Sequence, residues 1–361
     1  MCKYGLMKTN FCNAPAVLLA LAVSAAAQVK TEIPPAVPGA KAVTVEHLRV
    51  HGAALEGNLE GDSPDREVMV FLPPDYATAK GRRYPVVYAL HGYSIGAEQW
   101  SQEIHVPQTI EGAFALGAQD MIVVLPDSKT VHGGSMYSSS ATTGDFERFI
   151  AHDVVAYIDA HYRTLANRAS RGLAGHSMGG YGAARIGMKH PDVFGAVYIM
   201  SPCCLEPRSA GSLRAADEKA LEAVKTPADS AGLSFGQRAQ IASAAAWSPD
   251  PKNPPLYFDL PMKNGVAQED VLAKWDANSP LAFVDQYIGN LRQYRAIAMD
   301  VGDQDGLRAG AGKLHEILDS YGIANMFEVY HGTHTSAVAD RFQNHVLPFF
   351  SKNLCSTVNC R

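Results

Sequence analysis

A serine between closely spaced glycines lies near the middle of the sequence. Residues 175–180 have the sequence GHSMGG, which contains the pattern G-x-S-x-G with Ser177 at its centre. An apolar run precedes the motif and a helix-like segment follows it, which is the setting of a nucleophile elbow. The glycines permit a sharp turn between strand and helix that exposes the serine hydroxyl. The motif therefore predicts that Ser177 is a nucleophile.

A serine hydroxyl needs a base that removes its proton, and the base needs an acid that orients it. In chains with this elbow the acid and the histidine follow the serine in that order. Asp305 follows an apolar run at residues 295–299, and His334 follows another at residues 327–330. We therefore expect Asp305 and His334 in loops at the same edge of the sheet as Ser177.

Neighbouring residues leave alternatives for both partners. Asp303 is the alternative to Asp305 as the acid, because both follow the same strand closely. Asp300 ends that apolar run, and we expect it to be a structural carboxylate that accepts backbone hydrogen bonds. His331 lies nearer to its strand than His334 and is the weaker candidate for the base.

Ester chemistry of this kind also needs backbone donors for the negative charge that develops on the carbonyl oxygen. One donor is the amide that follows the nucleophile, which is that of Met178. The other should come from the loop after an early strand, here the amide of Tyr93 after the run at residues 85–90. Gly92 would allow the backbone to approach the substrate. The predicted oxyanion hole is thus formed by Tyr93 and Met178.

The elements that position these residues have the pattern of an α/β fold. Residues 46–55 and 65–72 alternate as an antiparallel pair. Short continuous apolar runs follow, separated by helix-like segments, which is typical of a mostly parallel sheet buried on both faces. The predicted strands comprise residues 85–90, 121–125, 172–174, 196–200, 295–299 and 327–330. The predicted helices comprise residues 149–162, 179–189, 313–321 and 336–352.

One interval is too long for an ordinary connection between strands. About ninety residues separate Met200 from Arg295, which indicates an insertion at about residues 203–290. We expect it to form a cap over the carboxyl edge of the sheet, where ligands bind in open α/β folds. Apolar residues of this insert are expected to line or support the acyl or leaving-group pocket, namely Leu233, Phe235, Trp247, Tyr257 and Phe258.

The chain begins with a pattern typical of export. Lysines at positions 3 and 8 precede an apolar run that ends in small residues, so residues 1–27 are expected to be a signal peptide. The protein would then be secreted or periplasmic. Residues 28–42 are rich in proline and alanine and predict a tether. Residues 43–354 would form the catalytic domain, and residues 355–361 a C-terminal tail.

Charge and histidine spacing exclude several classes of partner. The net charge of the chain is −5, and no basic face is evident, which argues against nucleic acid. The apolar run at residues 14–26 is shorter than the roughly 20 residues of a membrane span. The histidines lack metal-ligand spacing, and no complete nucleotide-binding loop occurs. We therefore expect no cofactor and no metal.

Four cysteines remain after the predicted cleavage. Cys355 and Cys360 would close a short loop at the C-terminus in an oxidising compartment. Cys203 and Cys204 are adjacent, and they could be free thiols, a strained vicinal bridge, or partners of distant cysteines.

Several motifs in the same order resemble the putative-esterase family of α/β hydrolases, which includes esterase D, feruloyl esterases and mycolyltransferases. They comprise residues 70–76 (VFLPPDY), 84–92 (YPVVYALHG), 124–127 (VLPD), 175–180 (GHSMGG) and 332–334 (GTH). The resemblance extends over residues 65–350 and implies an α/β-hydrolase fold. It implies the same triad, Ser177, Asp305 and His334, and the same oxyanion donors.

The chain departs from this pattern after the histidine, where relatives often carry an aromatic residue and this chain has Thr335, Ser336 and Ala337. The resemblance therefore does not extend to feruloyl specificity. The sequence favours a secreted serine esterase that acts on a small-molecule or carbohydrate-linked ester. An acyltransferase with the same triad is the alternative, and a non-catalytic binding protein on the same fold is disfavoured by the intact triad.

Overall fold

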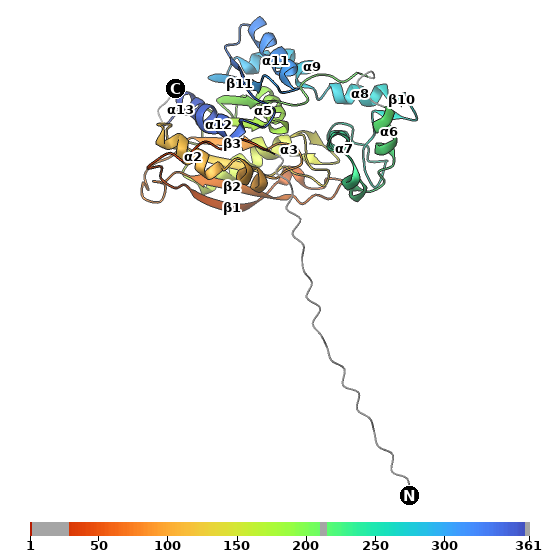
Figure 1. The fold of residues 1–361 in the computed structure, drawn as a ribbon, viewed down its shortest axis with the longest axis horizontal. Coiled ribbons are helices and arrows are strands. Elements are labelled where there is room, and N and C mark those ends of the chain that lie inside the picture. The colour runs from red at the N-terminus through yellow and green to blue at the C-terminus, as the bar shows by residue number, and fades with distance from the viewer. Residues whose placement is uncertain (2–28, 210–214, 358–361) are drawn as a thin grey trace.

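The computed structural model of the chain describes Met1 and residues 29–209 and 215–357 (Figure 1). Apart from Met1, the predicted signal peptide lies outside the described residues. Cys355 is disulfide-bonded, and its predicted partner Cys360 also lies outside them.

An eight-stranded sheet forms the centre of the described part, in the order β1-β2-β4-β3-β7-β8-β11-β12. β2 runs antiparallel to both β1 and β4, and the remaining neighbours are parallel. This is the predicted mostly parallel sheet preceded by an antiparallel pair. The strands are β1 (Thr44–His51), β2 (Asp65–Leu72), β3 (Val86–Leu90), β4 (Ile122–Pro126), β7 (Arg171–His176), β8 (Ala196–Met200), β11 (Ala296–Gly302) and β12 (Met326–Tyr330).

The apolar runs form central strands because both faces of the sheet are covered. Every residue of β3, β4 and β8 is buried. Successive residues of β3 face opposite sides, so Val86 and Tyr88 belong to one core cluster while Val87 and Ala89 belong to the other. A strand that supplies two cores has no polar face, which explains the continuous apolar pattern in the sequence.

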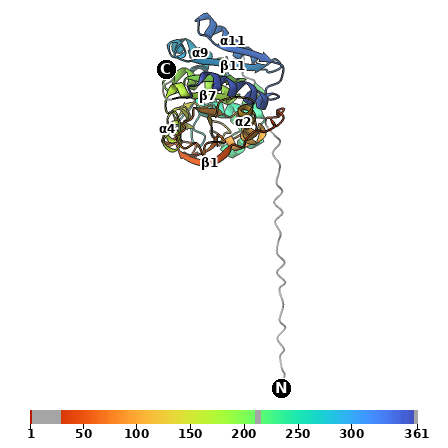
Figure 2. The same ribbon diagram turned by 90° about the vertical axis from the view of Figure 1, so that its left-hand side faces the viewer.

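Helices cover the two faces of the sheet, as Figure 2 shows from the side. α4 (Val155–His161), α5 (Met178–Lys189) and α11 (Arg308–Ser320) contribute to one core cluster. α1 (Ala97–Glu103), α2 (Val106–Ala115), α12 (Val338–Arg341) and α13 (Leu347–Asn353) contribute to the other. In the chain, α5 follows β7 directly, and Ser177 lies in the turn between them.

The first strand and the segment between β3 and β4 differ from what was predicted. The first strand ends at His51, followed by a short 3-10 turn, Ala53–Leu55. Gly52 lies so close to the core that a Cβ there would be 2.6 Å from the Phe149 ring, and the chain turns at this point. The helices α1 and α2 between β3 and β4 were not among the predicted elements, although Val106, Ile110 and Ala113 of α2 have helical spacing.

Residues 29–42, the described part of the tether predicted at residues 28–42, contain no helix or strand and lie against the folded domain. The side chain of Thr31 donates a hydrogen bond to the Ser336 carbonyl and accepts one from the Ala339 amide. The Glu32 amide also donates to the Ser336 carbonyl. The segment therefore contacts the loop that follows His334.

The insert between β8 and β11 lies at one side of the domain, on the right in Figure 1. The side chain of Arg185 in α5 donates a hydrogen bond to Asn278, and the hydroxyl of Tyr181 donates to the Asn278 carbonyl. The insert is thus attached directly to the helix that follows Ser177. Its main described elements are α6 (Ala215–Glu222), α7 (Phe235–Trp247), β9 (Met262–Lys263), β10 (Val266–Ala267), α8 (Glu269–Asp276), α9 (Pro280–Phe283) and α10 (Ile288–Leu291).

Candidate active site

Ser177 occupies a strained turn between β7 and α5. Its φ is +61°, in the region that favours glycine, and it is the N-cap of α5. The flanking glycines are required by close packing. A Cβ on Gly175 would lie 2.1 Å from the Gly179 carbonyl oxygen, and a Cβ on Gly179 would lie 2.0 Å from the Leu90 carbonyl oxygen. The G-x-S-x-G spacing therefore fixes the position of the Ser177 hydroxyl.

Two hydrogen bonds join the serine, histidine and aspartate that the sequence singled out. His334 Nε2 lies 2.9 Å from Ser177 Oγ, and His334 Nδ1 lies 2.7 Å from Asp305 Oδ2. With Nδ1–H donating to the carboxylate, Nε2 is left free to accept the serine proton. The structure thus brings together residues that are up to 157 positions apart in the chain.

The Asp305 side chain is buried and ionised. Only 2% of it is exposed, against 34% of the His334 side chain. Burial acts to raise the pKa of Asp305, but the hydrogen bond and charge of His334 and the amide of Leu307 outweigh it and hold the pKa below its ordinary value. A buried carboxylate in this state stabilises the imidazolium that forms when His334 takes up a proton.

The two neighbouring aspartates have other partners. Asp303 accepts hydrogen bonds from His331 Nδ1 and from the Gly332 amide, each 3.0 Å long. It therefore pairs with the weaker histidine candidate. Asp300 is buried in β11 and accepts hydrogen bonds from Arg341 and the Tyr198 hydroxyl, each 2.8 Å long.

We expected Asp300 to accept backbone hydrogen bonds, and this was wrong, because the partners found are side chains on a helix and a neighbouring strand. Burial raises the pKa of Asp300 to about 6, although the charge of Arg341 opposes the shift. Asp300 is thus part of a structural ion pair beneath the site.

The two predicted oxyanion donors lie beside Ser177. Met178 is the first residue of α5, so its amide lacks an acceptor within the helix. A Cβ on Gly92 would lie 3.5 Å from the Ser177 Cβ, so the loop that carries Tyr93 passes next to the nucleophile. Within the described residues, the amides of Tyr93 and Met178 both lack a backbone acceptor. Both are therefore available to a substrate carbonyl oxygen.

The sequence of the chain also matches a family of known proteins. The family model described as putative esterase matches residues 63–346, which include all the residues discussed above. The chain belongs to the putative esterase family.

Two relatives are similar to part of this chain. An esterase of Mycobacterium tuberculosis is 32% identical over 126 residues, which are 34% of this chain and 26% of that protein. An endo-1,4-beta-xylanase/feruloyl esterase of Xylanibacter ruminicola is 29% identical over 136 residues, 37% of this chain and 19% of that protein. The chain thus matches only about a quarter or less of the length of these relatives.

Two solved structures are similar to this chain over most of its length. A solved ferulic acid esterase superposes with a TM-score of 0.62 and 24% identity, covering 87% of this chain and 100% of that one. The fluorophosphonate-binding serine hydrolase FphF of Staphylococcus aureus gives a TM-score of 0.57 and 16% identity, covering 86% and 98%. These structures show the α/β-hydrolase fold that the sequence predicted.

One residue of this esterase-family site was missed by the sequence analysis. His176 precedes the nucleophile, and its Nε2 lies 2.8 Å from the His334 carbonyl oxygen. The two imidazole rings also pack with centroids 4.8 Å apart. Burial lowers the pKa of His176 to about 3, so the ring is neutral and can donate from Nε2. Its place inside the G-x-S-x-G motif shows that it adjoins the nucleophile, but the motif does not indicate this contact.

The insert approaches the site through Phe235. This ring is 53% exposed and meets the Tyr93 ring edge-on, with centroids 5.4 Å apart. Trp247 and Phe258, which were also predicted to line or support the pocket, are buried in the main core cluster. Phe235 is therefore the apolar residue of the insert that the structure places beside a predicted oxyanion residue.

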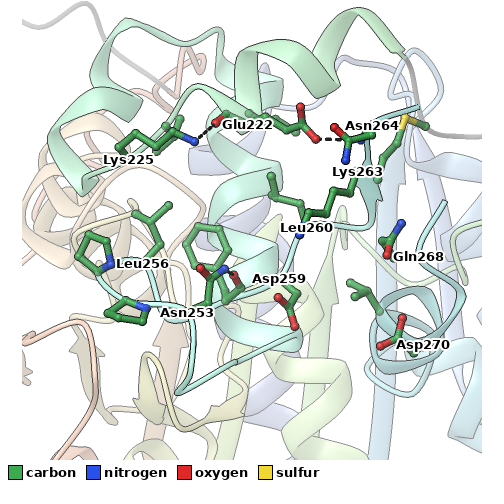
Figure 3. A pocket seen from close by; sticks show the side chains of 17 residues that line it. Glu222, Lys225, Asn253, Leu256, Asp259, Leu260, Lys263, Asn264, Gln268 and Asp270 are labelled. Atoms are coloured by element: carbon green, nitrogen blue, oxygen red, sulfur yellow. Dashed lines mark hydrogen bonds between the residues drawn. The ribbon is translucent and has the colours of Figure 1, made fainter. Parts of the chain in front are cut away.

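A separate cavity of about 600 Å³ lies within the insert (Figure 3). Glu222 from α6 and Asp270 from α8 face it from two sides, and Phe258 contributes an apolar wall. Ser177, Asp305 and His334 are not among the residues that line it. This cavity is therefore distinct from the space above the nucleophile.

In the described part of the chain, no group of three or more His, Cys, Asp or Glu side chains is arranged to hold a metal ion. In residues 29–209 and 215–357, no helix has the length and apolar character needed to cross a bilayer.

Proposed function

We propose that this chain is a serine esterase that cleaves carboxylic esters through an acyl-enzyme on Ser177. The observation that carries the proposal is the pair of hydrogen bonds from Ser177 Oγ through His334 to Asp305, which are 2.9 and 2.7 Å long. Membership of the putative esterase family supports the same reaction class.

In the first half of the reaction, His334 Nε2 takes the proton of Ser177 as Oγ attacks the ester carbonyl carbon. The carbonyl oxygen becomes negatively charged, and the amides of Tyr93 and Met178 donate hydrogen bonds to it. His334 then gives its proton to the leaving alkoxide. Water repeats the sequence on the acyl-enzyme and releases the acid, which restores the free serine.

The proposal is tested by replacing the nucleophile. Ser177→Ala should lower kcat/KM for p-nitrophenyl acetate about a thousandfold or more, because the covalent route is lost. The exposed Ser63→Ala serves as the control and should retain the parent rate. Circular dichroism would show whether both variants keep the fold. Full activity in folded Ser177→Ala would contradict the proposal.

Hydrolysis and acyl transfer share the acyl-enzyme, so their products distinguish them. We infer that water is the main acceptor. With a sugar alcohol present in excess, the free acid should remain the dominant product in a chromatographic assay. A new ester as the main product would instead identify an acyltransferase.

We further propose that the chain is exported. The charged and apolar pattern of residues 1–27 supports this, and the disulfide at Cys355 fits an oxidising compartment. Mass spectrometry of the protein from the cell envelope or medium should find a mature chain that begins near Gln28. A chain that keeps residues 1–27 and stays in the cytoplasm would contradict export.

A further inference from the structure

Two adjacent cysteines lie next to the turn that carries the proposed nucleophile. Cys203 and Cys204 are free cysteines, adjacent in the chain and partly exposed. The Cys203 amide donates a 3.1 Å hydrogen bond to the Ser177 carbonyl oxygen. The dithiol is therefore connected by a single backbone contact to the turn that holds the Ser177 hydroxyl.

The chain around the dithiol packs tightly against the same turn. A Cβ on Gly180 would lie 2.5 Å from the Met200 carbonyl oxygen and 2.9 Å from the Pro202 Cα. The residues between β8 and Cys203 thus touch the first turn of α5. A shift of the backbone at Cys203 has little room to occur without disturbing the nucleophile turn.

Cys204 has the surroundings of a reactive thiol. Its φ is +58°. The neighbouring Cys203 side chain and the charge of Arg208 lower the pKa of Cys204, although burial opposes the shift. Arg208 is itself held by the insert, since its guanidinium lies 5.4 Å from the Trp275 ring centroid and its amide donates to Asp276.

We propose that Cys203 and Cys204 form a reversible modification site that low-molecular-weight disulfides oxidise to a vicinal disulfide. The Cys204 thiolate attacks one sulfur of the small disulfide, forms a mixed disulfide and releases one thiolate. Cys203 then loses its proton and attacks the Cys204 sulfur, which releases the second thiolate. The protein gives up two electrons and two protons, and the small disulfide becomes two thiols.

Ring closure is favoured by proximity and opposed by strain. The two cysteines are adjacent in the chain, which makes the second attack intramolecular. Adjacent Cα atoms lie about 3.8 Å apart, whereas bridged cysteines usually have Cα atoms about 4.4–6.8 Å apart. The bridge should therefore be easily reduced, and its formation should shift the backbone at Cys203. We expect the shift to weaken the contact with Ser177.

The modification is tested by mass, independently of activity. The full-length protein is incubated with hydroxyethyl disulfide, its remaining thiols are blocked with N-ethylmaleimide, and it is digested with trypsin without reduction. The fragment of residues 190–208 contains Cys203 and Cys204 and no other cysteine. It should be two hydrogens lighter than the dithiol form and carry no blocking group. Dithiothreitol should restore the dithiol.

Two variants locate the steps. Cys203→Ser should stop at the mixed disulfide on Cys204, because the second attacking thiol is absent. Arg208→Gln should slow the first step severalfold by removing the charge beside Cys204. A fragment in the parent protein that carries two blocking groups, or a mixed disulfide that does not proceed to the bridge, would overturn the proposal.

The consequence for catalysis rests on the proposed function and is measured separately. Oxidation should lower kcat/KM for p-nitrophenyl acetate about fivefold, the effect of losing one backbone hydrogen bond. Cys204→Ser should have the same kcat/KM as the parent in its dithiol form. The small disulfide should not change the rate of this variant. If the bridge forms without any change in rate, the coupling to Ser177 is wrong. If Ser177→Ala is as active as the parent, the esterase proposal fails while the modification site stands.

Discussion

His176 Nε2 donates a hydrogen bond to the His334 carbonyl oxygen over 2.8 Å. The bond joins the residue before the nucleophile to the backbone of the proposed base. His334 is therefore held at its ring by Asp305 and at its main chain by His176. The loop of His334 follows β12, which is an edge strand with a neighbouring strand on one side only.

His176 should act as a positioning residue. His176→Phe keeps an aromatic ring against His334 and removes the hydrogen bond, so kcat should fall about tenfold with little change in KM. Steady-state kinetics with p-nitrophenyl acetate measure the two constants. The exposed His161→Phe is the matched control and should leave both unchanged. An unaltered kcat in folded His176→Phe would show that the bond does not position the base.

The two aspartates after β11 should differ sharply in their effect on rate. Asp305→Asn removes the charge that orients and stabilises protonated His334, so kcat should fall by about a thousandfold or more. Asp303→Asn should cost less than about threefold, because Asp303 contacts exposed His331. Steady-state kinetics measure kcat for both variants. A larger loss of kcat in Asp303→Asn than in Asp305→Asn would assign the acid to Asp303.

An ion pair outside the site should make the stability of the fold depend on pH in the acidic range. Glu147 accepts hydrogen bonds from Arg185 and Lys189 of α5, at 2.7 and 3.0 Å. Burial acts to raise the pKa of Glu147, but His190, Arg185 and Lys189 outweigh it and lower the pKa from 4.5 to about 2. A carboxylate with a lower pKa in the folded state stabilises the fold above its unfolded pKa, and the stabilisation is lost as the pH falls toward 2.

Glu147→Gln should therefore lower the free energy of unfolding by about 3 kcal/mol at neutral pH, and the difference from the parent should shrink toward acid pH. Urea denaturation at several pH values measures it. The exposed Glu316→Gln is the control and should change stability little at any pH. A difference for Glu147→Gln that stays constant between neutral pH and pH 2 would contradict the linkage.

Phe235 should influence the choice of ester. Its ring projects from the insert beside Tyr93 with 53% of its surface exposed, so it can contact an acyl or leaving group bound above the oxyanion hole. Phe235→Ala should lower kcat/KM severalfold for an aromatic-acyl ester and much less for an acetate. Val266→Ala, an exposed apolar position elsewhere in the insert, should leave the ratio unchanged. An unchanged ratio for Phe235→Ala would remove the insert from the substrate site.

The sequence could predict those site residues that are marked by a short motif or by the end of a strand. The elbow around Ser177 was predictable because the glycine spacing, the preceding strand and the following helix lie within a few residues of each other. Asp305 and His334 were predictable because parallel strands end at one sheet edge, so residues that follow β11 and β12 must lie near the end of β7. Local order and sheet topology were sufficient for the placement of these three side chains.

Contacts between distant residues had no such signal. Nothing in the G-x-S-x-G motif indicates that the His176 ring meets a carbonyl 158 positions later. The pairing of Asp303 with His331 became clear only once both loops were placed. In the insert, Phe235 and Trp247 begin and end the same helix, α7, so the exposure of the one and the burial of the other depend on tertiary packing.

Covalent labelling of the nucleophile tests the central claim most directly. A fluorophosphonate reacts with a serine only where a base activates the hydroxyl and donors stabilise the developing charge. Tryptic residues 172–185 contain Ser177 as their single serine. Mass spectrometry of the labelled protein should find the phosphonyl group on this fragment at one group per chain, with no label in Ser177→Ala or in denatured protein. An unlabelled fragment in active protein, or a label that persists in Ser177→Ala, would contradict the assignment of Ser177 as the nucleophile.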